Sequence, residues 1–437
     1  MVIKLFHRHS LLACVCLLVI AVALCMAVNF SGGTQPAQTS LPEGSMSSVA
    51  SSQAEEPPAS SSAQQEPPAV TAPAAAEEMR AVWVPYMSLD MSKEENRSEA
   101  AFQKKFDAII AGSKAVGMNA LIVHVRPFGD ALYPSELYPW SHIVGGTQGV
   151  NPGYDPLAYM VKATHDAGME FHAWINPMRV QLGDTPSILA QTNAYNLWKE
   201  DAAKAGWIVQ TDTGKYFNPA YKEVRKLVAD GAKEIAEKYD VDGIQFDDYF
   251  YPTEDASFDQ AAYGEYTQSA AKNGTPLNLQ EWRRANVNAL VQLTYSEIKS
   301  VKPEVQFGIS PQANVENDLK IGADVNAWCS VRGYVDYICP QLYVNFENPT
   351  LPFNVAADQW KQMVKDDNIK LYFGLAAYKA GSDADDGTWK KSNNILAQQV
   401  SLGRQTDCDG FMFYSWEYLN AEQTKEEIQN VIKQLNG

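Results

Sequence analysis

The sequence predicts a (β/α)8 barrel, because short apolar segments alternate with amphipathic helical patterns eight times after residue 78. Runs rich in Val, Ile and aromatic residues are typical of buried parallel strands. The expected strands are 80–86, 120–126, 170–176, 243–248, 305–310, 337–343, 370–377 and 410–416. An open, doubly wound sheet is the alternative, but the first strand is followed by Tyr86-Met-Ser-Leu-Asp-Met, which is not a glycine-rich nucleotide-binding loop.

The helical patterns and the long connections place a site at one end of this barrel. The expected helices are 99–116, 156–167, 222–238, 279–300, 322–329, 355–365, 394–404 and 421–435. The longest connections, 127–154, 177–221 and 252–278, follow the second, third and fourth strands. They lie on the face where barrel enzymes form active sites, and loops of this length are usually functional or disordered. Their Tyr, Trp, Pro and Gly residues favour ordered walls of a substrate site.

The first 78 residues differ in composition from the rest. Lys4 and Arg8 precede an apolar run at 11–28, an order typical of an export signal. The length of this run lies between that of a signal-peptide core and that of a spanning helix, so both a cleaved signal and a retained anchor stay open. Residues 29–78 are mainly Ser, Ala, Pro, Gln, Glu and Thr, which predicts a disordered linker. We expect a signal or anchor at 1–28, a linker at 29–78 and an extracytoplasmic barrel at 79–437, secreted or anchored to the cell membrane.

Charge, cysteine and histidine content exclude several classes of protein. The net charge of −17 is spread along the chain, which argues against nucleic acid or anionic membranes as partners and is compatible with a neutral polysaccharide. Cys329, Cys339 and Cys408 show no close spacing, so buried thiols are favoured over a single disulfide pair. Of the six histidines, His7 and His9 belong to the expected signal segment, and the other four contain no close-spaced pair. We therefore expect no metal and no cofactor, and a zinc-dependent deacetylase is a poor interpretation.

Two adjacent carboxylates, Asp247 and Asp248, follow the fourth expected strand. The carboxyl end of a buried parallel strand is where barrel enzymes hold catalytic groups. Neighbouring residues on a strand point to opposite faces, so we expect only one of the two to face the barrel interior. The alternative is that either carboxylate caps a loop or a helix.

Glycosidic bond cleavage needs two carboxyl groups, one protonated and one ionised as nucleophile or base. We expect one strand-four aspartate to work with Glu417, which follows the eighth strand across the mouth and which Trp416 would shield from water. A structural role of Glu417 at the start of the last helix is the alternative, and Glu347 is a weaker candidate for the acid. The roles of Asp247, Asp248 and Glu417 stay open, as do the sugar, the linkage and the stereochemical outcome.

Polar and aromatic side chains at the ends of the other strands are expected to bind substrate. They are His124, Arg126, Trp174, Asn176, Arg179, Tyr249, Gln312, Gln341, Tyr343 and Trp416. On the second strand, His124 and Arg126 would share one face, with Val125 on the other. Taken singly, His124 or Arg126 has an equally simple explanation as the partner of a neighbouring carboxylate. The joint pattern favours a sugar-binding mouth.

Seven runs resemble the bacterial glycosyl hydrolase-like family 10 proteins, from about residue 78 to the mid-380s or beyond. They are Arg80-Ala-Val-Trp-Val, Asn119-Ala-Leu-Ile-Val-His-Val-Arg126, His172-Ala-Trp-Ile-Asn-Pro-Met-Arg179, Asp242-Gly-Ile-Gln-Phe-Asp-Asp-Tyr-Phe-Tyr-Pro252, Ile309-Ser-Pro311, Pro340-Gln-Leu-Tyr343 and Gly410-Phe-Met-Phe-Tyr-Ser-Trp416. The resemblance implies an exported barrel glycoside hydrolase with the strand-four aspartates as its foremost catalytic residues. Members of that family have been linked to bacterial cell-wall glycan strands.

The strand-four run is also similar to the chitinase family 18 pattern Asp-Gly-x-Asp-x-Asp-x-Glu, with two departures. Gln245 replaces the first inner aspartate, and Tyr249 stands in place of the acidic glutamate. These departures argue against a mechanism assisted by the substrate's N-acetyl group, unless Asp248 has taken the acid role. The sequence thus predicts an exported glycosidase acting on a polysaccharide such as peptidoglycan. A catalytically silent barrel that binds glycan as a cell-wall scaffold is the alternative.

Overall fold

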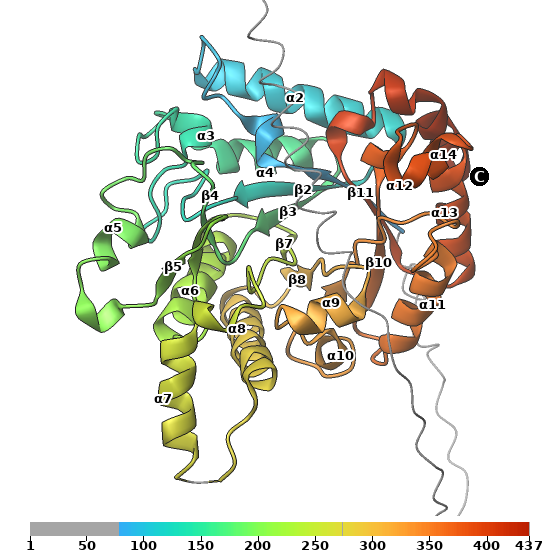
Figure 1. The fold of residues 1–437 in the computed structure, drawn as a ribbon. Helices are drawn as coiled ribbons and strands as arrows, with labels where there is room; N and C mark the ends of the chain where they lie inside the picture. Colours follow the sequence, from blue (N-terminus) through green and yellow to red (C-terminus); the bar gives the residue numbers. More distant parts are fainter. Residues whose placement is uncertain (1–77, 273, 437) are drawn as a thin grey trace, which may run out of the picture. The chain divides into compact units, whose positions relative to one another are not determined.

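The computed structural model describes residues 78–272 and 274–436, which form a closed barrel of eight parallel strands surrounded by helices (Figure 1). In order around the barrel, the strands are β1 (Met79–Val84), β2 (Ala120–Arg126), β3 (Glu170–Ile175), β7 (Gly243–Phe246), β8 (Gln306–Ile309), β9 (Tyr337–Ile338), β10 (Lys370–Leu375) and β11 (Gly410–Phe413). Pairing of β1 with β11 closes the barrel. This confirms the (β/α)8 prediction and excludes the open sheet. The expected signal or anchor and nearly all of the expected linker lie outside the described residues.

A helix follows each barrel strand on the outside. In chain order these are α2 (Glu99–Val116), α4 (Pro156–Asp166), α6 (Lys222–Lys238), α8 (Leu279–Val301), α10 (Val325–Trp328), α11 (Phe353–Met363), α13 (Ile395–Gln405) and α14 (Lys425–Asn436). Local signals fix their ends: the Ser98 side chain caps the start of α2, and Gly117 ends it in the left-handed conformation at φ 90°. Asn278 and Glu281 form a capping box at the start of α8.

Strand alternation divides the apolar side chains between two layers. Residues such as Val82, Val123 and Phe246 pack outward into the cluster beneath the helices. Alternate residues such as Trp83, Ile122 and Met412 form the second cluster, which fills the barrel interior. Gln245 also points inward, where its side chain accepts a hydrogen bond from Trp83 Nε1 at 2.6 Å and donates to the Tyr337 hydroxyl at 3.3 Å. This polar group is therefore satisfied inside an apolar barrel.

The connections after β2, β3, β7, β8 and β10 contain structure of their own. The connection after β3 forms a small antiparallel sheet of order β4-β6-β5, from β4 (Arg179–Leu182), β5 (Ile208–Gln210) and β6 (Gly214–Phe217). Short helices also occur: α3 (His142–Gly145), α5 (Ala194–Trp198), α7 (Gln260–Ala270), α9 (Val315–Lys320) and α12 (Ala384–Gly387). In Figure 1, α7 projects away from the barrel. The small sheet was not predicted, because strands this short carry too little pattern to be distinguished from loop.

Two further expectations can be compared with the described residues. Cys329 and Cys339 are buried, Cys408 is half-buried, and all three are free thiols, in agreement with the favoured interpretation. Over 78–272 and 274–436, no helix combines the length and the apolar character that crossing a bilayer requires.

A buried ion pair holds the connection after β7 against α8. Arg283 donates from Nε and Nη2 to the two carboxylate oxygens of Asp259, at 2.9 and 2.6 Å. Its remaining donors reach the carbonyl oxygens of Thr253, Glu254 and Asp255. Both side chains are almost fully buried. The guanidinium thus organises one wall of the face on which the site lies.

We expect Asp259→Asn to lower the free energy of unfolding by about 3–5 kcal/mol, because it leaves the buried guanidinium charge without its partner. Urea denaturation followed by circular dichroism measures this change. Arg332→Met is the matched control, since it removes the ion pair of an exposed arginine with Asp366 and should leave the midpoint almost unchanged. Equal losses in the two variants would contradict the assignment.

Candidate active site

Asp247 lies at the barrel mouth on the side of β3. The register pairs Trp174 with Gln245 and Ile175 with Phe246, so the residues that follow β3 and β7 meet directly. Asp247 Oδ2 accepts hydrogen bonds from Trp174 Nε1 at 3.0 Å and from Asn176 Nδ2 at 3.1 Å. The carboxyl is buried, with only 4 % of the residue exposed. Two predicted binding residues, Trp174 and Asn176, therefore hold this carboxyl in place.

Asp248 turns toward the other side of the same mouth. Its Oδ1 accepts a hydrogen bond at 3.0 Å from Gln341 Nε2, which also donates to the carbonyl oxygen of Ser310 at 3.0 Å. Because β7 ends at Phe246, strand alternation no longer constrains the next two residues. The expectation that only one of the two aspartates faces the interior is therefore wrong: both carboxyl groups line the mouth.

Burial changes the acidity of both carboxyl groups. It raises the pKa of Asp247 to about 7; the charge of Arg179 and the hydrogen bond from Trp174 lower this pKa, whereas the charge of Asp248 raises it. Burial also raises the pKa of Asp248, against the hydrogen bond from Gln341 and the charge of Arg179. Groups that interact this closely titrate as a pair. At neutral pH the mouth can hold a carboxyl proton, as a general acid must.

His124 faces the interior from β2 and stacks on Trp174, with ring centroids 3.7 Å apart. Burial, together with the charge of Arg179, lowers its pKa well below the usual value, so the ring is neutral. The residue is only 2 % exposed, and neither ring nitrogen has a hydrogen-bond partner among the described residues. Unsatisfied buried polar groups are rare, so His124 remains a candidate binding residue beside Trp174.

Arg126 is not at the mouth. The pairing of β2 with β3 is irregular between His124 and Arg126, which places Arg126 beside Ile175 on the outer face. Its guanidinium carbon lies 4.4 Å from the centre of the Tyr138 ring, and only the lack of a side chain at Gly231 of α6 leaves room for Nη1. The expectation that His124 and Arg126 share a face is wrong, because a bulge interrupts the alternation on which it rested.

Arg179 and Tyr249 form a stacked pair at the mouth. The guanidinium carbon lies 4.8 Å from the centre of the Tyr249 ring and 5.9 Å from that of Phe128. The Arg179 backbone N–H donates to Asn176 Oδ1 at 3.0 Å, so Asn176 links Arg179 to Asp247. Tyr249 is 51 % exposed and offers its ring to solvent. Both predicted binding residues therefore lie beside the carboxyl pair.

Tyrosines that follow β9, β10 and β11 form a third part of the mouth. The rings of Tyr343, Tyr378 and Tyr414 lie 5.8–6.0 Å apart, centre to centre. Tyr414 also contacts Trp174, at 6.5 Å. Burial raises the pKa of Tyr343 well above its usual value, so its hydroxyl stays protonated. Tyr378 and Tyr414 were not among the predicted site residues, although both stand at expected strand ends.

Gln312 is held in position by a buried carboxyl group, that of Asp318, which the sequence did not indicate. Its backbone N–H donates to Asp318 Oδ1 at 2.9 Å, and its side chain stabilises the ionised form of Asp248. Asp318, on α9, is fully buried, and burial raises its pKa well above the usual value. The Asp318 carboxyl thus positions the backbone of Gln312 from behind the mouth.

Glu417 and Trp416 differ from expectation. They follow β11, which lies opposite β7 in the strand order. Glu417 is exposed and accepts hydrogen bonds from Ser88 and Ser415. The Trp416 ring packs beside Gly112 of α2, so it neither shields Glu417 nor faces the mouth as a sugar platform. Glu347 is likewise exposed and forms an ion pair with Lys391.

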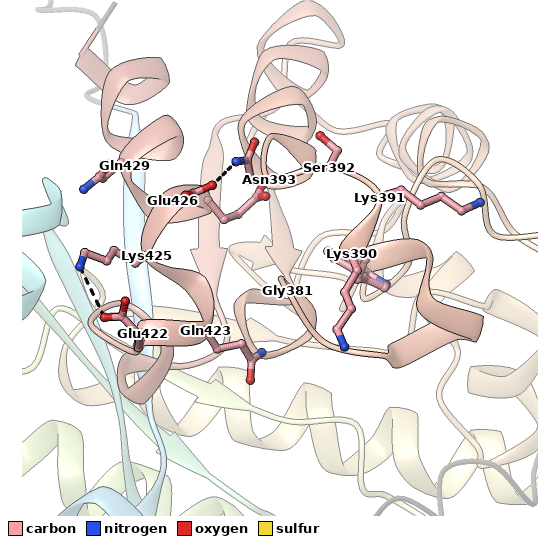
Figure 2. A pocket seen from close by; sticks show the side chains of 12 residues that line it. Gly381, Lys390, Lys391, Ser392, Asn393, Glu422, Gln423, Lys425, Glu426 and Gln429 are labelled. Atoms are coloured by element: carbon pink, nitrogen blue, oxygen red, sulfur yellow. Dashed lines mark hydrogen bonds and ion pairs between the residues drawn. The ribbon is translucent and has the colours of Figure 1, made fainter.

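A groove of about 640 Å³ lies elsewhere, beside α14 (Figure 2). Its lining includes the charged side chains of Lys390, Lys391, Glu422, Lys425 and Glu426. Several of these are already paired: Lys425 contacts Glu422 at 3.5 Å, and Glu426 accepts a hydrogen bond from Asn393. The groove contains none of the predicted site residues. The groove also contains Glu427, whose pKa burial raises to about 7, but this single carboxyl accepts hydrogen bonds from backbone N–H groups at the start of α13. We place the active site at the barrel mouth because two adjacent buried carboxyl groups with raised pKa values meet the predicted binding residues there. Over the described ranges, no three His, Cys, Asp or Glu side chains are grouped to hold a metal ion.

A parallel barrel with two buried carboxyl groups and aromatic walls at its mouth defines a protein of the glycosidase class. The family model described as glycosyl hydrolase-like 10 matches residues 78–391, and the chain belongs to this family. It is 34 % identical over 366 residues to Glycosyl hydrolase YngK of Bacillus subtilis (strain 168), across 78 % of this chain and 69 % of that protein. It is 31 % identical over 374 residues to Glycosyl hydrolase DigH of Escherichia coli (strain K12), across 80 % and 83 %.

Solved structures with the same fold are more distant in sequence. The glycoside hydrolase domain of PgaB (BpsB) from Bordetella bronchiseptica aligns with a TM-score of 0.52 at 11 % identity, over 80 % of this chain and 98 % of that one. Alpha-L-fucosidase isoenzyme 2 from Paenibacillus thiaminolyticus aligns with a TM-score of 0.51 at 15 % identity, over 82 % and 49 %. These likenesses show the barrel fold. The family membership confirms the resemblance found in the sequence, and the enzyme class is that of a glycosidase.

The raised pKa of Asp247 predicts a stability that depends on pH. Its folded value of about 7 exceeds an unfolded value of about 3.9, so the stabilisation is complete below pH 4 and is lost as pH rises through 7. The asparagine side chain in Asp247→Asn carries no charge. At pH 8, this substitution should therefore raise the free energy of unfolding above that of the wild type, by on the order of 2–4 kcal/mol. The difference should vanish near pH 4.

Urea unfolding at pH 4, 6 and 8 measures this effect. Asp240→Asn is the control, because the Asp240 side chain is 89 % exposed at the other end of β7. A gain for Asp247→Asn that is the same at pH 4 and pH 8 would show that the carboxyl charge is not its cause.

Proposed function

We propose that this glycosidase hydrolyses peptidoglycan glycan strands outside the cytoplasm, with Asp247 as general acid and Asp248 as its ionised partner. The observation that carries the proposal is the pair of buried carboxyl groups at the mouth, one of which has a pKa of about 7. The similarity to a family linked to cell-wall glycan strands supports the substrate. The apolar run at 11–28 supports export, with the protein either secreted or anchored to the membrane.

The hydrogen bonds around Asp247 suit an acid. Oδ2 accepts from both Trp174 and Asn176, whereas Oδ1 has only a long contact, 3.4 Å, from the Tyr249 backbone N–H. Oδ1 is thus the oxygen that can hold a proton and give it to the leaving glycosidic oxygen. After the transfer, the indole and amide donors stabilise the new carboxylate.

The surroundings of Asp248 suit a charged carboxylate. Gln341 donates to it, Gln312 favours its ionised form, and Arg179 lowers its pKa. An ionised carboxylate can act as nucleophile, as base or as stabiliser of the positive charge that develops on the sugar. Glu417 lies across the barrel and is the alternative partner for Asp247. The rings of Tyr249, Tyr343 and Tyr414 then provide faces on which sugar rings can stack.

Asp247→Asn and Asp248→Asn should each reduce hydrolysis by about 10²–10⁴-fold, because each removes one of the two carboxyl functions. Release of soluble sugar fragments from purified peptidoglycan, quantified by mass spectrometry, measures the loss, and Asp240→Asn should retain wild-type activity. Wild-type rates in both variants would refute the assignment. Co-sedimentation with peptidoglycan without products from any form would favour the catalytically silent, glycan-binding barrel.

The pH profile identifies the acid. If Asp247 supplies the proton, kcat/KM should fall as pH rises above about 7, because the protonated form is lost. In Asp247→Asn, the residual activity should no longer show this alkaline limb. If Glu417→Gln removes the limb and Asp247→Asn retains it, the acid is Glu417.

A further inference from the structure

Arg179 is a cation without a counter-ion at the mouth. Its guanidinium makes no hydrogen bond to any described residue, and no described carboxylate lies within 4.0 Å of it. Its Nε is buried and has no hydrogen-bond partner among the residues that the structure describes. The planar group stacks near the ring of Tyr249 and also contacts that of Phe128, and these contacts hold its position. The charge is close enough to lower the pKa values of both Asp247 and Asp248.

Two buried arginines differ from Arg179 in their hydrogen bonds or in their accessibility to a ligand. Arg283 is buried and saturated, with two hydrogen bonds to Asp259 and three to carbonyl oxygens. Within the described ranges, both Nη atoms of Arg126 also lack partners, but this side chain is enclosed against Tyr138 and α6, where no substrate can reach it. Arg179 is half-buried at the open end of the barrel. It therefore combines unpaired donors with access for a ligand.

We propose that Arg179 binds a carboxylate carried by the sugar next to the scissile bond and so makes the enzyme selective for an acidic glycan. A guanidinium presents a fork of N–H donors that matches a carboxylate, and such charge-assisted bonds are the strong ones. The neutral ring of His124, stacked on Trp174, adds one N–H donor nearby. A neutral glycan that covers the guanidinium would leave its Nη donors without a charged partner, which costs binding energy.

This inference rests on the proposed function, since in peptidoglycan the carboxylate would be the free lactyl group of N-acetylmuramic acid. The local charge at Arg179 thus refines the expectation from the net charge of −17, which was compatible with a neutral polysaccharide. Uronic acids also carry a carboxylate, so the probes must distinguish a uronic acid from N-acetylmuramic acid.

The test compares kcat/KM for three oligosaccharides of equal length. One alternates N-acetylglucosamine with N-acetylmuramic acid bearing free carboxylates, the second has the same carboxylates converted to methylamides, and the third contains hexuronic acid. The wild type should prefer the free-carboxylate muramyl probe over its amide by about 10- to 100-fold. Arg179→Met should abolish this preference, because it slows the acidic probe more than the amide, and Arg179→Lys should retain part of it.

Arg332→Met is the matched control and should keep the wild-type ratio, because Arg332 is exposed and lies before β9, away from the mouth. A wild-type ratio near one, or an equal loss on both muramyl probes in Arg179→Met with an unchanged circular dichroism spectrum, overturns the inference. A preference for the hexuronic probe would support recognition of a carboxylate by Arg179, but it would overturn N-acetylmuramic acid as the sugar that carries it.

Binding separates this inference from the proposed function. If the wild type cleaves no probe, calorimetric titration with the same muramyl pair decides the role of Arg179. Tighter binding of the acid than of the amide, lost in Arg179→Met, supports recognition of a carboxylate although the proposed hydrolysis fails. Equal binding, or none, overturns the inference.

Discussion

The parallel pairing of β3 with β7 is the constraint on which the mouth of this barrel depends. It sets Trp174 opposite Gln245, so that the next inward residue after β7 is Asp247, within reach of the Trp174 indole. The same register lets Asn176 bridge the carboxyl of Asp247 and the backbone of Arg179. Below them, Gln245 ties β7 to Trp83 of β1 and to Tyr337 of β9 across the interior. A shift of one residue in this pairing would turn the carboxyl toward the helices.

Much of the fold followed from the sequence because barrel strands buried on both faces leave continuous apolar runs between amphipathic helices. All eight strands and the eight main helices occur where the patterns placed them, and α2 and α6 have the predicted bounds. What the patterns could not show were breaks in regularity. A bulge in β2 turned Arg126 outward, and the early end of β7 freed Asp248 from alternation. The small sheet formed by β4, β5 and β6 was missed because each of its strands is very short.

The candidate site was predictable as a set of strand ends but not as a set of contacts. Trp174, Asn176 and Gln341 prove to be direct partners of the carboxyl pair. Trp416 and Glu417 come from an equally suggestive strand end, yet the chain turns there so that the indole packs on α2 and the carboxylate meets two serines. Residues that hold the site residues in position without lining the mouth, such as Asp318 on α9, cannot be identified from a linear sequence. Their role comes from burial, which only the folded chain defines.

Three ionisable groups, Asp247, Asp248 and Arg179, share this buried mouth, and their charges are linked. With one carboxyl proton present, the three sum to zero; with none, they sum to minus one in surroundings where an uncompensated charge is costly. Burial outweighs the attraction of Arg179, since the pKa of Asp247 still reaches about 7. A carboxylate bound to Arg179 would neutralise the charge that lowers this pKa. By linkage, binding an acidic sugar would make Asp247 hold its proton more firmly, so the same contact that selects the substrate would also keep the acid protonated.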